Sequence, residues 1–257
     1  MTETFKTRLH RGDRLLGFFI GTPSPAVVEM AGYCGYDFVI IDTEHGPADI
    51  ETIENMLRAA AMHGMAGLVR VPDGSYASIQ RVLDAGADGI MVPHVMNADL
   101  AREVVDRALF APQGRRGVAL SRSSAYGAGD AKEYYATRNR HTVVIVMIED
   151  AEALPVVNDI VAVPGIDAVF IGPGDLSASL GHAGDTKHPV VQQAVAQVAA
   201  AAKRHGIARA TVGRSAEDVR RLKAEGIGMV CFNTTAMLVN AMQALQKELA
   251  QDPGKAS

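Results

Sequence analysis

Eight short apolar runs recur along the 257 residues, and each is followed by a longer segment whose apolar residues have helical spacing. Short apolar runs that alternate with helices are typical of parallel strands joined by crossover helices. The predicted strands are residues 16–21, 38–42, 66–71, 89–93, 143–148, 168–171, 208–211 and 229–232. The predicted helices are residues 25–31, 50–63, 78–85, 100–109, 151–160, 189–205, 216–225 and 235–249.

This alternation, with no Pro/Ser-rich linker to divide it, predicts the α/β class and a single (β/α)₈ TIM barrel over residues 1–257. An open, doubly wound sheet is the alternative architecture. Its signature is a GxGxxG turn that opens a helix, and no such turn follows any of the eight runs. The pattern therefore favours the barrel.

Residues 111–140 interrupt the rhythm between the fourth and fifth strands. Insertions of this length are typical of lids, binding loops or subunit contacts. The segment contains a predicted short helix over residues 130–138 and the basic residues Arg115, Arg116 and Arg122. These arginines suit a carboxylate or sugar-acid substrate, bound within one chain or across a subunit boundary, and a solvated loop is the alternative.

The charge balance and the cysteines exclude several classes of protein. Lys and Arg number 25 against 29 Asp and Glu, so we expect neither nucleic acid nor an anionic membrane as a partner. No secretory signal is visible at the start, and no run approaches the roughly 20 apolar residues of a membrane span. Cys34 and Cys231 lie in apolar contexts far apart, which predicts buried, reduced thiols and a cytoplasmic location.

Polar side chains follow four of the predicted strands at the point where each strand ends. They are Asp42 and His45 at the second strand, Arg70 at the third, Glu149 at the fifth and Asp175 at the sixth. The active site of a (β/α)₈ barrel forms at the carboxyl ends of its strands. We therefore expect these side chains to share one rim.

Glu149 and Asp175 are the candidate metal ligands. Two carboxylates without a cysteine make a hard oxygen site, which favours Mg²⁺ or Mn²⁺ over zinc. A 2-oxo acid would offer its keto and carboxylate oxygens to such a metal, which would polarise the carbonyl. The alternative is that Glu149 and Asp150 cap one helix and that Asp175 caps the next.

His45 and Arg70 are the candidate acid–base and anion-binding residues. An imidazole beside the Asp42 carboxylate suits general-base catalysis near neutral pH, and a solvated or structural histidine is the alternative. The planar guanidinium of Arg70 suits a carboxylate or an oxyanion, and an ion pair with Asp42 or Glu44 is compatible with that role. None of the seven lysines falls in a predicted strand, which argues against a Schiff-base aldolase.

Five segments carry a family resemblance. They are residues 41–47 (IDTEHGP), 69–72 (VRVP), 113–118 (QGRRGV), 148–149 (IE) and 170–177 (FIGPGDLS). Together they resemble the HpcH/HpaI family of class II, metal-dependent pyruvate aldolases, and the likeness runs from about residue 5 to residue 249.

The resemblance implies reversible aldol cleavage of 4-hydroxy-2-oxo acids to an aldehyde and pyruvate, or a related 2-oxo acid such as hydroxypyruvate. Known members act on dicarboxylic oxo acids, deoxy sugar acids and hydroxypyruvate. The implied cofactor is a divalent metal, Mg²⁺, Mn²⁺ or Co²⁺, with no organic cofactor. The implied residues are the metal ligands Glu149 and Asp175, the substrate-binding set Arg70, Gly172, Pro173, Gly174 and Asp175, and the catalytic set Asp42, His45, Arg70 and Asp84.

One residue matches the family pattern at an unexpected place in the barrel, and two residues depart from the pattern. Asp84 matches the family's partner for His45, but the predicted helix ends there, at the face opposite the active site. It would reach a catalytic mouth only from a neighbouring subunit. Met147 stands where the family often has Gln, and Gly174 stands where Ala is common.

The family is typically hexameric, with the last helix exchanged between neighbours, so the resemblance implies a homo-oligomer. The apolar spacing of Ala236, Val239, Met242 and Leu245 predicts a helix that packs on its own barrel or on a partner. Two other functions stay open from the residues alone. One is a metal-dependent barrel lyase that acts on an acyl-CoA or a phosphoenolpyruvate-like substrate, and the other is a non-catalytic metabolite-binding protein.

Overall fold

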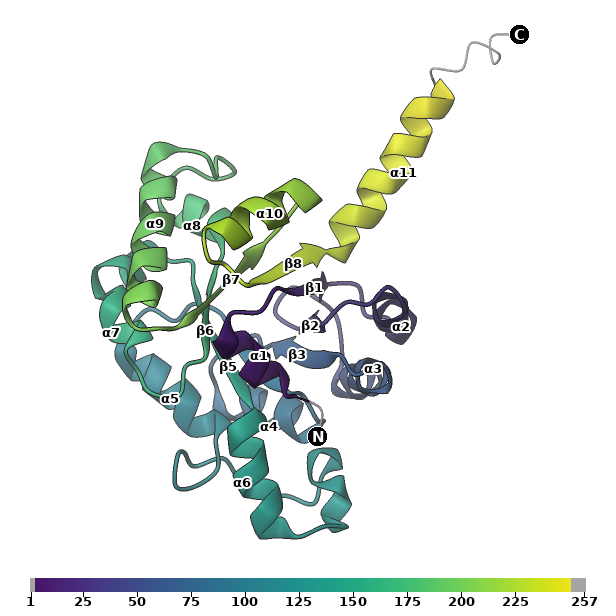
Figure 1. Ribbon diagram of the computed structural model, residues 1–257, viewed down its shortest axis with the longest axis vertical. Helices are drawn as coiled ribbons and strands as arrows, with labels where there is room; N and C mark the ends of the chain where they lie inside the picture. The colour runs from purple at the N-terminus through teal and green to yellow at the C-terminus, as the bar shows by residue number, and fades with distance from the viewer. Residues whose placement is uncertain (1–2, 251–257) are drawn as a thin grey trace.

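Eight parallel strands close into a barrel in the order in which they occur along the chain (Figure 1). The structure is a computed structural model, and it describes residues 3–250. The strands are β1 (Leu15–Ile20), β2 (Phe38–Asp42), β3 (Ala66–Arg70), β4 (Gly89–Val92), β5 (Val143–Ile148), β6 (Ala168–Ile171), β7 (Ala208–Val212) and β8 (Met229–Asn233). The predicted (β/α)₈ barrel is confirmed. The expectation of one domain over residues 1–257 stays a prediction, because residues 1–2 and 251–257 lie outside the described ones.

Helices follow the strands around the outside of the barrel (Figure 1). They are α2 (Pro25–Tyr33), α3 (Ile50–Met62), α4 (Tyr76–Asp84), α5 (Ala98–Ala108), α7 (Val157–Val161), α9 (Pro189–Arg204), α10 (Ala216–Ala224) and α11 (Thr234–Ala250). Additional elements are α1 (Phe5–Arg11), the 3₁₀ turns η1 (Arg122–Gly127) and η2 (Ala151–Val156), α6 (Ala131–His141) and α8 (Pro173–Ser179). Residues 151–160, predicted as one helix, are η2 followed by α7, because Pro155 has no N–H to donate within a helix.

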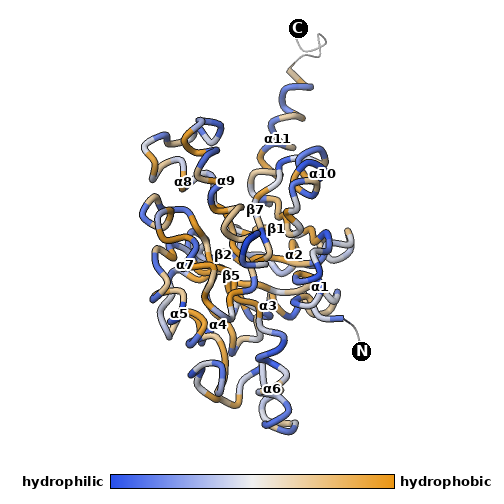
Figure 2. The backbone as a smooth tube through the Cα atoms, turned by 60° about the vertical axis from the view of Figure 1, so that its left-hand side comes forward, coloured by the Kyte–Doolittle hydropathy of each residue, from blue (hydrophilic) through white to orange (hydrophobic). Residues whose placement is uncertain are grey.

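Side chains of the strands alternate between two apolar cores, one inside the barrel and one between the strands and the helices. Figure 2 shows hydrophobic residues concentrated in the strands at the centre of the molecule. In β2, Phe38 and Ile40 point inward, whereas Val39 and Ile41 pack against helices. Because inward positions repeat every two residues, the next inward position after Ile40 is Asp42. The same count leads from Leu68 to Arg70 and from Met147 to Glu149. The strand period thus brings these three polar side chains to the carboxyl rim.

α1 closes the opposite, amino-terminal end of the barrel. Its Arg8 lies 2.6 Å from Asp37, and its Lys6 lies 3.0 Å from the buried Asp167. These two aspartates precede β2 and β6, on different sides of the barrel. The helix is therefore held across this end, and the carboxyl rim is the one left for a substrate.

α11 projects away from the barrel, and Thr234 at its start is its one buried residue (Figure 1). No helix in the described part of the chain is long and apolar enough to cross a bilayer. Cys231 lies in the barrel interior, where burial raises the pKa of its thiol to about 12. Cys34 is exposed, so its predicted burial is wrong: it follows the last residue of α2, beyond the buried face that carries Val28 and Ala31.

Candidate active site

Arg70 and Asp42 form a buried, two-point ion pair at the carboxyl rim. Arg70 Nε donates to Asp42 Oδ1 at 2.9 Å and Nη2 donates to Oδ2 at 2.8 Å. Nη1 lies 2.8 Å from Glu44 Oε2, and the guanidinium stacks 4.7 Å from the Phe19 ring. Burial opposes the charge of Arg70, yet Asp42 and Glu44 outweigh it and raise the pKa of the guanidinium. Both ion pairs considered from the sequence are therefore present.

Asp42 also shapes the turn that carries His45. Its Oδ1 accepts the main-chain N–H groups of Glu44 at 3.2 Å and of His45 at 3.3 Å. A Cβ at Gly46 would lie 2.3 Å from the Asp42 carbonyl oxygen, so only glycine fits there. The turn presents the His45 side chain to solvent, 65% exposed, with Nε2 3.9 Å from Glu44 Oε2. His45 thus lies beside Glu44 and Arg70 on the same rim.

Glu149 is buried with one carboxylate oxygen unused. Its Oε1 accepts the main-chain N–H of His94 at 3.1 Å, whereas its Oε2 has no hydrogen-bond partner among the described residues. Burial, with the nearby charges of Asp175 and Glu44, raises the pKa of Glu149 to about 7 against the opposing effect of His94. A buried, unpaired carboxylate oxygen is costly without a cation or a proton.

The surroundings of Glu149 fit a divalent cation. Asp175, in the first turn of α8, is exposed and close enough for its charge to act on Glu149. A Cβ at Gly172 would lie 2.8 Å from Glu149 Oε2, so glycine keeps the space beside that oxygen free. Within residues 3–250 no group of three or more His, Cys, Asp or Glu side chains is arranged to bind a metal ion by itself. Two carboxylates would leave the remaining positions to water or substrate, as hard cations such as Mg²⁺ usually do.

The alternative that these carboxylates only cap helices is not supported by their contacts. Asp150 precedes η2 but its side chain makes no capping hydrogen bond, and the residue that caps α8 is Gly172 rather than Asp175. A Cβ added at Gly174 would contact nothing within 4 Å, so glycine and alanine fit equally well at this position in the first turn of α8. Met147 is buried near Gly172 and Glu149.

His94 is the residue of the rim that the sequence reasoning missed. It follows β4 and has a left-handed backbone, φ 53°. Its Nδ1 lies 3.0 Å from Asp150 Oδ2, and its Nε2 lies 3.3 Å from Glu44 Oε1. The hydrogen bond to Asp150 is the main cause that raises the pKa of His94. The rule that selected the other site residues, a polar side chain just after an apolar strand, also points to this histidine.

Asp84 does not join the other candidates within one chain. It is the last residue of α4, at the amino-terminal end of the barrel, as the sequence predicted. Its Oδ1 accepts a hydrogen bond from Arg116 Nη2 at 2.9 Å. The Arg116 side chain is completely buried and lies over the Phe110 ring at 4.5 Å.

The arginines of residues 111–140 are bound by their own chain. Arg115 pairs with Asp106 at 2.8 Å, and Arg122 donates to the Ala85 carbonyl oxygen at 2.9 Å. Arg116 is buried against Asp84, so it belongs neither to a solvated loop nor to an open binding loop within one chain. Arg115 is 86% exposed, and substrate binding by Arg115 and Arg122 stays a prediction.

Comparison with known proteins places this geometry in a family. The HpcH/HpaI aldolase/citrate lyase profile matches residues 15–240. A hydroxypyruvate/pyruvate aldolase of Paraburkholderia phytofirmans is 37% identical over 254 residues, covering 96% of this chain and 97% of the relative. A 2-keto-3-deoxy-L-rhamnonate aldolase of Escherichia coli is 34% identical, covering 97% of this chain and 93% of the relative.

A solved structure agrees with the sequence relatives. The crystal structure of an HpcH/HpaI aldolase/citrate lyase family protein from Burkholderia cenocepacia superimposes with a TM-score of 0.89 at 34% sequence identity. It covers 96% of this chain and 98% of that protein. The similarity therefore extends over the whole barrel and not only over the motifs.

Proposed function

Because the chain belongs to the HpcH/HpaI aldolase/citrate lyase family, we propose that it cleaves 4-hydroxy-2-oxo acids reversibly to pyruvate and an aldehyde with a divalent metal. It is a carbon–carbon lyase of the pyruvate aldolase type. The observation that carries the proposal is the shared rim of Arg70 and Glu149, a fixed cation beside a buried carboxylate with a free oxygen. That combination suits a reaction in which negative charge develops on a substrate oxygen.

Glu149 and Asp175 would hold the metal. A bound Mg²⁺, Mn²⁺ or Co²⁺ would polarise the substrate carbonyl as a Lewis acid. The main-chain N–H groups of Gly174 and Asp175, in the first turn of α8, have no acceptor within the helix. These N–H groups are suited to donate hydrogen bonds to the substrate carboxylate. The space beside Gly172 and Pro173 would accommodate that carboxylate.

Arg70 supplies the fixed positive charge. A guanidinium has five N–H donors. Arg70 donates hydrogen bonds to Asp42 through Nε and Nη2, and its Nη1 forms an ion pair with Glu44 at 2.8 Å, so further N–H groups on Nη1 and Nη2 are available to a substrate oxygen. We assign these to the keto oxygen that becomes the enolate oxygen. Asp42 fixes the plane of the guanidinium, so the donors need no reorganisation as charge develops.

His45 is the proposed base. In cleavage it accepts the proton of the C4 hydroxyl while the C3–C4 bond breaks, so the bond electrons pass to the enolate and the aldehyde is released. Protonation of the enolate at C3 then gives pyruvate. Of the lysines within residues 3–250, none lies in a strand, so the proposal needs no Schiff base.

Asp84 and α11 support a homo-oligomer as part of the proposal. Since Asp84 lies at the far end of its own barrel, it can assist a His45 only in a neighbouring copy. α11 exposes a row of large apolar side chains. These are Met237, Leu238, Val239, Met242, Leu245 and Leu249.

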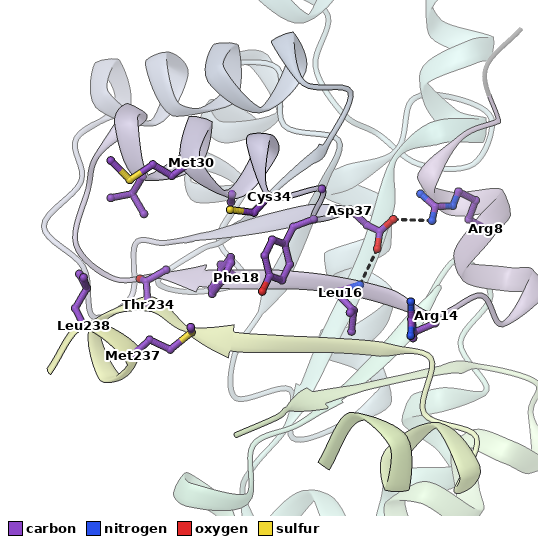
Figure 3. A pocket seen from close by; sticks show the side chains of 14 residues that line it. Arg8, Arg14, Leu16, Phe18, Met30, Cys34, Asp37, Thr234, Met237 and Leu238 are labelled. Carbon is purple, nitrogen blue, oxygen red and sulfur yellow. Dashed lines mark hydrogen bonds and ion pairs between the residues drawn. The ribbon is translucent and has the colours of Figure 1, made fainter. Parts of the chain in front are cut away.

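A groove on the flank of the barrel is lined in part by apolar side chains, which suit the exposed apolar side chains of α11. It has a volume of about 740 Å³ and lies between α2, β1 and the first turn of α11 (Figure 3). Phe18, Met30 and Leu238 are among the side chains that line it (Figure 3). The outer helices of a (β/α)₈ barrel normally cover such flanks. We therefore propose that copies of this chain exchange α11, in line with the hexamer implied by the family resemblance.

Release of pyruvate from 4-hydroxy-2-oxo acids tests the proposed activity. EDTA-treated protein would be assayed with dicarboxylic and deoxy-sugar oxo acids and with hydroxypyruvate adducts, and pyruvate or hydroxypyruvate would be quantified by coupled reduction with NADH. We expect turnover only after addition of metal, and a large loss in His45→Asn. The matched control, His205→Asn, changes an exposed histidine at the end of α9 and should keep full activity. Folded protein that releases no 2-oxo acid from any of these substrates with any of the three metals would contradict the proposal.

A further inference from the structure

His94 has a backbone conformation that few residues with a Cβ adopt, although histidine adopts it more often than most. Its φ of 53° lies in the left-handed region, which side chains with a Cβ adopt only when the surroundings hold them there. Within residues 3–250 the other non-glycine residues with positive φ, Ala125 and Tyr126, lie in η1, outside the barrel. His94 is therefore the one strained residue of this kind at the carboxyl rim of the described chain.

We propose that His94 is a positioning residue for the metal site, whose left-handed main chain holds Glu149 so that only its Oε2 faces the cation. The inference rests on the proposed function in one respect, namely that Glu149 is a metal ligand. It adds a residue to which the family resemblance assigned no role.

The main-chain N–H of His94 sets the orientation of the Glu149 carboxylate. It donates to Oε1 at 3.1 Å, and Oε2 remains buried without a hydrogen-bond partner in the described structure. Rotation of the carboxylate would exchange the two oxygens only by breaking this hydrogen bond. The donor thus selects one oxygen for the cation, and groups of this kind around metal ligands typically affect metal affinity tenfold to a hundredfold.

The imidazole of His94 stabilises the strained backbone by binding on two sides. Nδ1 lies 3.0 Å from Asp150 Oδ2, and Nε2 lies 3.3 Å from Glu44 Oε1. Glu44 is itself fixed by Arg70 Nη1 at 2.8 Å. The ring is therefore held between side chains that follow β2 and β5 although it is 52% exposed, and this attachment offsets the cost of the left-handed conformation.

Direct measurement of Mn²⁺ binding separates the main chain of His94 from its ring. The electron paramagnetic resonance signal of free Mn²⁺ would be titrated against the metal-free protein, without substrate. His94→Val should weaken binding about tenfold or more, because a β-branched residue strongly disfavours positive φ. His94→Gly and His94→Asn tolerate that φ and keep the N–H, so they should bind within about threefold of the original protein.

A backup variant and a control complete the design. If His94→Val does not fold, His94→Ala serves, since alanine also disfavours positive φ; it should bind Mn²⁺ more weakly than His94→Gly. His205→Val replaces an exposed histidine at the end of α9 and should leave the affinity unchanged.

The outcomes distinguish this inference from the proposed function. Binding by His94→Val and His94→Ala equal to that of the original protein would overturn the positioning role and leave the metal site intact. Loss in His94→Gly as large as in His94→Val would also overturn it, because the ring would then be responsible. If the original protein itself bound no Mn²⁺, the metal-dependent function would fail, and the positioning role with it.

Discussion

Arg70 contacts both carboxylate oxygens of Asp42, through Nε at 2.9 Å and through Nη2 at 2.8 Å, and both side chains are buried. The planar fork of arginine matches a carboxylate at two points, which fixes the guanidinium in one orientation. Lysine would keep the positive charge but would lose that orientation. Replacement of Arg70 by lysine therefore separates the contribution of charge from that of geometry.

Arg70→Lys tests that separation. We expect kcat to fall by about a hundredfold or more, with a smaller change in KM, because the lost donors act mainly on the developing enolate. Steady-state release of pyruvate measures both constants. Arg58→Lys, in an exposed pair on α3, is the matched control and should keep the original turnover. Unchanged kcat in Arg70→Lys would remove the guanidinium from the mechanism.

Glu149 predicts a pH dependence of stability in the metal-free protein. Burial raises its pKa from 4.5 to about 7, so the folded chain holds this proton more tightly than the unfolded chain. Stability from this group is then fully present below pH 4.5 and is lost as the pH rises through about 7. Glu149→Gln carries no charge to bury. In EDTA it should raise the melting temperature more at pH 8 than at pH 5, and an equal effect at both pH values would contradict the assignment.

Gly172 and Gly174 form a matched pair for the space near Glu149. A Cβ at Gly172 would lie 2.8 Å from Glu149 Oε2, whereas a Cβ at Gly174 would meet nothing. Gly172→Ala should therefore displace the candidate ligand and weaken Mn²⁺ binding about tenfold, a typical effect of disturbing a metal ligand. Gly174→Ala should leave Mn²⁺ affinity unchanged. Calorimetric titration of the two variants decides this, and equal affinities would show that Oε2 does not face the cation.

α11 predicts the oligomeric state. Met242 and Leu245 are 63% and 57% exposed on a helix that projects from the barrel. Charged side chains at these positions would oppose burial in a partner's groove. Light scattering should find an oligomer for the original chain and a smaller species for the double variant Met242→Glu with Leu245→Glu. An identical mass for both would mean that α11 is not exchanged.

The strands were predictable because their sequences satisfy two conditions at once. Runs such as 38–42 and 143–148 are continuous and apolar, and each ends at a polar residue or turn. Asp42, Arg70 and Glu149 stand at the ends of three such runs, and that position predicted their shared rim. Local composition was sufficient here because burial on both faces leaves few residue types that fit.

The missed elements depend on contacts that are distant in sequence. α1 has only two apolar residues, Phe5 and Leu9, and is held by ion pairs to Asp37 and Asp167. α8 begins with Pro173-Gly174, which resembles a turn, yet proline fits the first position of a helix. Cys34 was assigned to the core from its apolar neighbours, although the helix that precedes it ends before the buried face returns.

His94 and Arg116 show a second limit of sequence reasoning. The role of His94 depends on its left-handed φ, and a histidine in a sequence does not by itself indicate that backbone conformation. Arg116 looked like part of a basic loop, but it stacks on Phe110 and binds Asp84 from a buried position. Composition indicates which chemical groups are available, and the tertiary structure decides which of them are already paired.

Exchange of deuterium into the methyl group of pyruvate tests the central claim most directly, because it requires the enolate and needs no aldehyde. EDTA-treated protein would be incubated with pyruvate in D₂O, with and without added Mg²⁺, Mn²⁺ or Co²⁺, quenched with EDTA and followed by proton NMR. We predict loss of the methyl signal only with metal, and about a hundredfold slower loss in Arg70→Lys. Folded protein that binds the metal but exchanges no methyl protons would contradict the account.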